Sequence, residues 1–186
     1  DEEVVTALQS AFPASRWFLS ADAMKSPEQI DAILKQDITE DEIFGYMTRQ
    51  NMDCYFDGDK LPGIRSEIAA VTEGIVFVYG VGAAYVQPSY DLLVYADMAR
   101  WEIQMRFRRN EVSNVGISNR EERASLQYKR AFFVDWRICD RFKKKLMKKW
   151  DYVLDTNTAG NPKMATAKVI EAGLEKASRT PFRVVP

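Results

Sequence analysis

Gly74-Ile-Val-Phe-Val-Tyr79 is the stretch that decides the expected fold, because it is a continuous apolar and β-rich run bounded by glycines. Asp91-Leu-Leu-Val-Tyr-Ala-Asp97 and Asp151-Tyr-Val-Leu-Asp155 are two further runs of this kind. Such runs are typical of strands that are buried on both faces of a parallel sheet. The run Phe182-Arg-Val-Val185 predicts a final strand.

Helical patterns lie between these runs. Residues 98–111 contain no helix breaker, residues 136–150 carry apolar side chains at four-residue steps, and Asn161-Pro162 caps a helix that continues to Ser178. The alternation of strands and helices predicts an α/β fold of three layers, with a mostly parallel sheet and helices on both of its faces. We expect one sheet to contain the strands at 75–79, 91–96, 151–155 and 182–185.

Two segments need a separate interpretation. Residues 131–134, Ala-Phe-Phe-Val, are either a further strand or the end of a helix that begins near Asn119. Ser26-Pro27-Glu28-Gln29 has the pattern of a helix N-terminus with a capping box, and it predicts a short helix to about Gln36.

The 186 residues suit one domain with a sizeable core. We interpret residues 1–186 as a single α/β domain from a longer chain, with an irregular acidic part at 1–65 and the sheet-and-helix core at 66–186. Residues 1–60 carry a net charge of −8 and residues 61–186 a net charge of +7. The two charged parts are either solvated faces, surfaces that meet each other, or the sign of a basic cleft for an anionic ligand.

Composition excludes several classes of site. The chain has no histidine, which excludes Ser-His-Asp catalysis, a histidine base and histidine-ligated zinc within it. A net charge of −1 argues against nucleic-acid binding, and no apolar stretch reaches the roughly 18 residues that span a membrane. Two cysteines cannot form a disulfide framework, so we expect reduced thiols and a cytoplasmic protein.

Ligands of such sheets bind beyond the carboxyl ends of the strands, so the loops that follow Tyr79, Asp97 and Asp155 are the places to look for chemistry. Gly80-Val-Gly-Ala-Ala84 directly follows a strand, and Gly80 and Gly82 could bring backbone amides close to a phosphate. The alternative is a tight turn between the strand and the next element.

Arginines provide the second candidate feature. Asp97 closes a strand and is followed by Arg100, Arg106 and Arg109, whose guanidinium forks suit bidentate phosphate recognition. Arg106 and Arg109 are about one helical turn apart and can address one ligand, while Trp101 and Met105 are expected in the core. The alternative is an exposed basic helix face. No residue is assigned a catalytic role.

The sequence also contains segments that carry a family resemblance. These are residues 95–109 (Tyr-Ala-Asp-Met-Ala-Arg-Trp-Glu-Ile-Gln-Met-Arg-Phe-Arg-Arg), residues 129–141 (Lys-Arg-Ala-Phe-Phe-Val-Asp-Trp-Arg-Ile-Cys-Asp-Arg), residues 150–157 and residues 181–186. In this order and spacing they resemble the N-terminal region of long bacterial class I mannose-6-phosphate isomerase-like proteins. The resemblance implies that a zinc-dependent cupin domain, which performs the isomerisation, follows this region.

The resemblance has consequences for function. The family's zinc site transfers to no residue of this chain, so we expect no metal or other cofactor here and zinc only in the downstream domain. It implies a non-catalytic accessory or regulatory domain of a sugar-phosphate enzyme. Its partners would be the downstream isomerase domain of the same polypeptide and a sugar phosphate or nucleotide, but neither nucleic acid nor a membrane.

A second resemblance points to a kinase-like scaffold. A strand that ends at Gly80, a strand that ends at Asp97 and a helix that leads into Arg106-Phe-Arg-Arg109 are similar to uridine-kinase-like P-loop phosphotransferases, which carry an arginine-rich lid in that place. The phosphate-binding pattern Gly-x-x-x-x-Gly-Lys-Ser/Thr occurs nowhere in the chain. A phosphotransferase acting on a nucleoside or sugar, and a purely structural interaction module, are therefore the two alternatives to the accessory domain.

Overall fold

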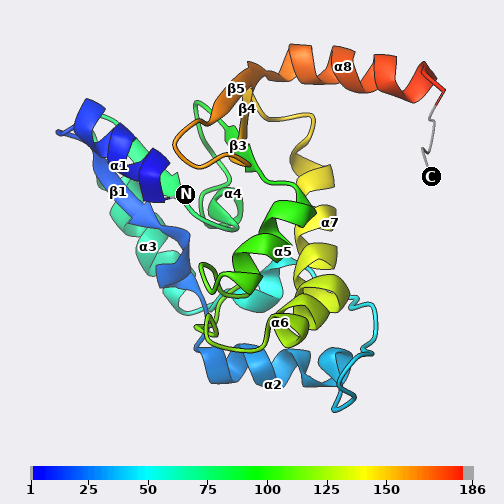
Figure 1. Cartoon of the computed structure of the whole chain (residues 1–186). Coiled ribbons are helices and arrows are strands. Elements are labelled where there is room, and N and C mark those ends of the chain that lie inside the picture. Colours follow the sequence, from blue (N-terminus) through cyan, green and yellow to red (C-terminus); the bar gives the residue numbers. More distant parts are fainter. Residues whose placement is uncertain (1, 182–186) are drawn as a thin grey trace.

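A computed structural model of the chain describes residues 2–181, and it contains both helices and short strands (Figure 1). The elements in chain order are α1 (Glu2–Ala11), β1 (Arg16–Leu19), η1 (Ser20–Ala23), α2 (Pro27–Ile38), η2 (Met52–Tyr55), α3 (Lys60–Ala69), β2 (Val76–Tyr79), α4 (Ala83–Val86), β3 (Val94–Asp97), α5 (Arg100–Arg108), α6 (Ala124–Arg130), η3 (Ala131–Asp135), α7 (Trp136–Leu146), β4 (Tyr152–Asp155), β5 (Lys163–Thr166) and α8 (Ala167–Arg179).

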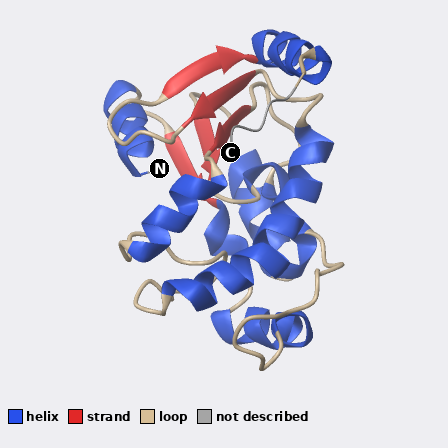
Figure 2. Ribbon diagram, turned by 45° about the vertical axis from the view of Figure 1, so that its right-hand side comes forward, coloured by secondary structure: helices blue, strands red, loops and turns tan. Residues whose placement is uncertain are grey.

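Within residues 2–181 the strands form two small sheets instead of the single sheet that the sequence predicts (Figure 2). One sheet is the parallel pair β1–β2, and the other has the order β3-β4-β5, with β3 parallel and β5 antiparallel to β4. The three expected strands that lie in the described residues are present, but β2 pairs with β1 and not with β3. The fourth, at 182–185, lies outside the described residues.

An aromatic contact explains the partner of β2. Trp17 of β1 and Phe77 of β2 are register partners, and their rings stack with centroids 4.1 Å apart. Cross-strand aromatic pairs of this kind stabilise a strand pair beyond its backbone hydrogen bonds. The pairing therefore draws β2 toward the N-terminal part of the chain.

The N-terminal part is also more regular than predicted. Residues 1–65 contain α1, β1, α2 and the first turns of α3. The helix predicted from Ser26 is confirmed as α2, with Pro27 in its first turn and a capping box between Ser26 and Gln29. Leu61-Pro62-Gly63, which resembles a loop in the sequence, lies in α3, where proline in the first helical turn removes no hydrogen bond.

The helical half of the molecule holds most of the core. Residues 131–134 belong to η3, a turn of π-helix that joins α6 to α7, so the helical interpretation of this segment is confirmed. Large, fully buried side chains come from α2, η2 and α7, and these are Ile30, Leu34, Tyr55 and Ile138; Val86 of α4 and Gln127 of α6 are buried as deeply. The helix expected from Asn161 begins only at Ala167, because residues 163–166 pair with β4.

The inward face of α5 differs from the prediction. Trp101 is 66% exposed, so its expected place in the core is wrong. Phe107 is the buried residue of α5, and Ile103, one turn earlier, packs in the same cluster. The face that includes positions 103 and 107 therefore turns inward, and the face that includes position 101 meets solvent.

Candidate functional site

The parallel pair β3–β4 brings the predicted Asp97 to one edge together with Asp155, its register partner. The backbone oxygen of Asp97 accepts hydrogen bonds from the amide and the hydroxyl of Thr156, each at 3.0 Å. Arg106 Nη2 donates in turn to the backbone oxygen of Thr156 at 3.2 Å. Asp97 and Arg106 thus lie together at the carboxyl ends of two parallel strands, which is where ligands bind in open α/β sheets.

The charge of Asp97 is balanced from α7. Lys143 Nζ donates to Asp97 Oδ2 at 2.7 Å, and the same ammonium group lies 5.1 Å from the centre of the Tyr95 ring. Burial is the main cause that raises the pKa of Tyr95, and the nearby Asp97 carboxylate adds to it. Asp97 therefore holds a lysine of α7 against the sheet.

Carboxylates bind part of the guanidinium group of two predicted arginines, Arg106 and Arg109. Glu102 Oε1 accepts from Arg106 Nε at 3.0 Å and from Arg109 Nη2 at 2.9 Å. Arg109 also holds Glu111 through two hydrogen bonds of 2.6 and 3.0 Å. These hydrogen bonds lower the pKa of Glu102 and of Glu111 and raise that of Arg109. The carboxylates occupy Nε and Nη2 of Arg109, so a phosphate that approached this side of the guanidinium would have to displace a carboxylate.

Arg100 belongs to a different contact. Its guanidinium lies 5.0 Å from the centre of the Trp136 ring and donates to Asp140 Oδ2 at 2.5 Å. Both partners are on α7, so Arg100 joins α5 to α7 instead of facing the edge where Arg106 lies.

The glycine loop forms a packed turn. Gly80 and Gly82 both have positive φ, at 103° and 79°. A side chain at Gly82 would meet the Phe56 ring at 2.6 Å and the Met52 sulfur at 3.2 Å, so close packing requires glycine there. Within residues 2–181, no hydrogen bond or ion pair joins this loop to Arg106 or Arg109.

A buried polar cluster is the feature that sequence reasoning missed. Asp135 accepts from the Tyr55 hydroxyl at 2.6 Å and from Asn114 Nδ2 at 2.7 Å, and Arg130 Nε lies 3.7 Å away. Burial raises the pKa of Asp135, although Arg130 and both donors favour its ionised form. Two residues along the chain from Asp135, Arg137 lies over the Phe132 ring, and Arg130 is the partner of Asp135. No sequence signal marked Tyr55 or Asn114.

The two thiols provide a testable consequence of burial. Burial raises the pKa of the Cys54 thiol to about 11 and that of Cys139 to about 12. A pKa of 11 reduces the thiolate fraction at pH 8 by more than about a hundredfold relative to an ordinary thiol. We therefore expect no reaction of the native chain with a disulfide reagent at pH 8 within minutes, measured by absorbance, and reaction of both thiols after unfolding in guanidinium. Rapid labelling of either thiol in the native chain would contradict this.

Metal and membrane features were searched over the described part of the chain. Residues 2–181 contain no group of three or more cysteine, aspartate or glutamate side chains placed to hold a metal ion. No helix among the same residues is long and apolar enough to cross a membrane.

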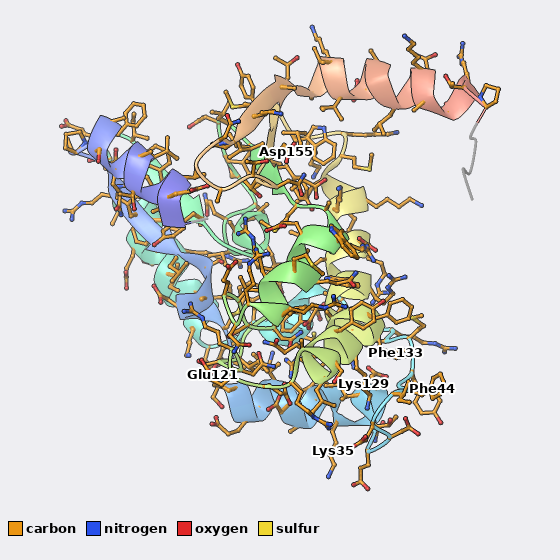
Figure 3. The ribbon with its side chains drawn as sticks, viewed as in Figure 1. Lys35, Phe44, Glu121, Lys129, Phe133 and Asp155 are labelled. Carbon is orange, nitrogen blue, oxygen red and sulfur yellow. The ribbon has the colours of Figure 1, made fainter. Side chains whose placement is uncertain are left out.

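Figure 3 shows that the labelled Asp155, at the end of β4, lies far from the labelled Lys129 and Phe44 at the opposite end of the molecule.

Comparison with known proteins gives one match. No curated protein and no solved structure matches the chain. A family model described as a domain of unknown function, DUF8485, matches residues 1–179. Because this match covers nearly the whole sequence, the chain belongs to the DUF8485 family.

Proposed function

We propose that this chain is a non-catalytic accessory domain of a mannose-6-phosphate isomerase-like protein, and that it binds the isomerase domain through α8. The observation that supports the proposal is the exposure of α8. Every residue from 171 to 180 is exposed, although the helix carries apolar side chains at helical spacing. Figure 1 shows α8 extending from β5 away from the body of the molecule.

The exposed face of α8 carries the apolar side chains that are typical of a helix face packed against another element. Ala167, Ile170, Leu174 and Ala177 form a stripe at three- and four-residue steps, and Leu174 is 50% exposed. Isolated helices shorter than about 12–15 residues are marginal in water, and most helices in proteins depend on the packing of an apolar face. α8 has 13 residues, and only its first turn contacts the sheet, so a packing partner would stabilise the rest.

The proposal also includes a kinase-like scaffold and a phosphorylated ligand for this domain. Two parallel strand pairs, with Asp97 and Arg106 at the carboxyl end of β3–β4, support a kinase-like, three-layer ancestry. A sugar phosphate or nucleotide would bind by exchanging with Glu111 on Arg109. The carboxylates on Arg106 and Arg109 favour the accessory role over a phosphotransferase, because a nucleotide phosphate that approached these guanidinium groups would compete with Glu102 and Glu111.

The test uses the full-length protein, in which the proposal places an isomerase domain after this domain. We expect this protein to isomerise mannose 6-phosphate in a coupled assay, and the isolated chain to show no turnover. Leu174→Asp should weaken the contact between the domains, because it places a charge in the apolar interface. We expect it to lower the unfolding temperature of the full-length protein by several degrees.

The matched control is Ala172→Asp, which adds the same charge on the opposite face of α8. It should leave the unfolding temperature close to that of the parent protein. Equal effects of the two substitutions would show that α8 has no docked face, and isomerisation by the isolated chain would show that the domain is catalytic. Absence of isomerase activity in the gene product would remove the family assignment on which the proposal rests.

A further inference from the structure

Two hollows lie end to end along the outer edge of β1. The first, with a volume of about 530 Å³, is lined by Ser15, Arg16, Trp17 and Phe18 on one side and by Glu67, Ala70 and Val71 on the other. The second, of about 360 Å³, is lined by Phe18, Leu19 and Asp22 and by Asp59, Lys60, Gly63, Ile64 and Glu67. Phe18 and Glu67 line both hollows, so together they form one groove between β1 and α3, here called the β1–α3 groove.

The strand at the base of this groove has an open edge. Among residues 2–181, β1 pairs only with β2, and the Arg16 amide donates toward β2, to the Ile75 oxygen at 2.9 Å. Backbone groups alternate in direction along a strand, so the amide and carbonyl of Trp17 and the amide of Leu19 point away from β2. The Leu19 carbonyl lies at the N-cap of η1 and accepts the first hydrogen bond of that helix. Within residues 2–181, the hydrogen bonds outside helices and strands include none to the Trp17 amide or carbonyl or to the Leu19 amide.

Carboxylates dominate the walls of the groove. Asp22, Asp59 and Glu67 line it, and none of the ion pairs in the described part of the chain includes any of them. Of the two cations in the lining, Lys60 donates to the backbone oxygen of Met24 at 2.8 Å. Arg16 and Lys60 together offset two of the three carboxylates, so the lining carries a net charge of −1, and the wider N-terminal part is acidic as well.

We propose that the β1–α3 groove binds an extended, basic polypeptide segment, which adds a third strand to the β1–β2 sheet. An exposed sheet edge recognises an extended backbone through alternating hydrogen bonds, and the neighbouring walls select the side chains. Here the amide and carbonyl of Trp17 and the amide of Leu19 supply the backbone contacts. Glu67, Asp22 and Asp59 supply the charge that selects lysine or arginine. This inference goes beyond the proposed function, because the groove and α8 are separate surfaces.

A pair of synthetic peptides tests the proposal on the isotope-labelled chain by nuclear magnetic resonance. The probe is acetyl-Lys-Val-Lys-Val-Lys-amide, and the matched control is acetyl-Glu-Val-Glu-Val-Glu-amide. We expect the basic peptide to shift amide resonances of residues 15–19 and 63–71 at millimolar concentration or below. The acidic peptide should bind at least tenfold more weakly, because it meets the same carboxylates.

Substitutions and peptide chemistry separate a strand addition from simple charge attraction. Glu67→Lys should weaken binding of the basic peptide at least fivefold, whereas Glu73→Lys, an equal charge change on an exposed residue outside the groove, should have little effect. A single N-methyl group on the peptide backbone should abolish binding when it replaces an amide hydrogen that faces β1. A methyl group on the next amide should be tolerated, because alternate amides of a strand face opposite ways.

The proposal is overturned if neither peptide shifts these resonances, or if the shifts lie outside the groove. Equal binding of the two peptides would also overturn it, as would equal effects of methylation at every position. A concentration-dependent dimer that buries β1 in the free chain would assign the edge to a second copy and would equally overturn the proposal.

Discussion

Replacing Asp135 by alanine is expected to lower the free energy of unfolding by about 3–5 kcal/mol, the cost typical of breaking a buried ion pair from one side. Asp135 is the common acceptor for the Tyr55 hydroxyl and Asn114 Nδ2, and it lies beside Arg130, whose side chain is 6% exposed. Without the carboxylate these buried donors lose their acceptor, and Asp31 alone is left to balance Arg130. Urea unfolding followed by tryptophan fluorescence measures the loss.

Asp140→Ala is the matched control for this substitution. Asp140 lies on the adjoining helix and pairs with Arg100 at 2.5 Å, but both side chains are close to half exposed. Exposed ion pairs contribute at most about 1 kcal/mol, so the control should change stability little. Asp135→Asn, which keeps one acceptor oxygen, should fall between the two. Equal losses from Asp135→Ala and Asp140→Ala would show that the buried cluster does not hold the core together.

The second large effect is expected at Lys129, which fixes an exposed apolar loop. Lys129 Nζ donates to the backbone oxygens of Thr39 and Asp41, and the side chain is buried. Figure 3 shows Lys129 and Phe133 close to the loop that carries Phe44. The loop exposes large apolar side chains, which are Ile43, Phe44, Tyr46 and Met47.

Lys129→Met keeps most of the side-chain volume but removes both hydrogen bonds. Hydrogen bonds to charged groups contribute about 1.5–3 kcal/mol, so the loop should open far more often. We expect chymotrypsin to cleave after Phe44 or Tyr46 at least tenfold faster than in the parent chain, measured by mass spectrometry. Lys35→Met is the control, because Lys35 is exposed on α2 and carries the same charge. Equal cleavage rates in the two variants would contradict a role of Lys129 in holding the loop.

Patterns among neighbouring residues predicted where strands and helices occur better than they predicted which strands pair. The apolar runs at β2, β3 and β4 and the capping box of α2 are visible in the sequence, because each depends on neighbouring residues. The choice of β1 as the partner of β2 depends on Trp17 meeting Phe77, a contact between distant positions that periodicity cannot reveal. β1 itself lies in the part at 1–65 that is interpreted as irregular from the sequence.

The candidate site shows the same limit. The rule for carboxyl ends of parallel strands predicted the edge where Asp97 and Arg106 lie. One carboxylate partner was also visible, since Glu102 precedes Arg106 by four residues, which is the spacing of a helical ion pair. Glu111 on Arg109 and the Asp135 cluster depend on loops that fold back in three dimensions, and no spacing rule finds them.

The pairing of β1 with β2 has a consequence for how the chain folds. Arg16 pairs with Val76, and the intervening residues contain α2 and α3. Parallel pairing over such a separation must first close a long loop, which makes folding slower than the formation of local helices. On the ribosome, β1 would leave the exit tunnel long before β2 and would wait with both edges open. Synthesis of the N-terminal part would therefore pass through a stage that favours contact with chaperones, until Val76–Tyr79 has emerged.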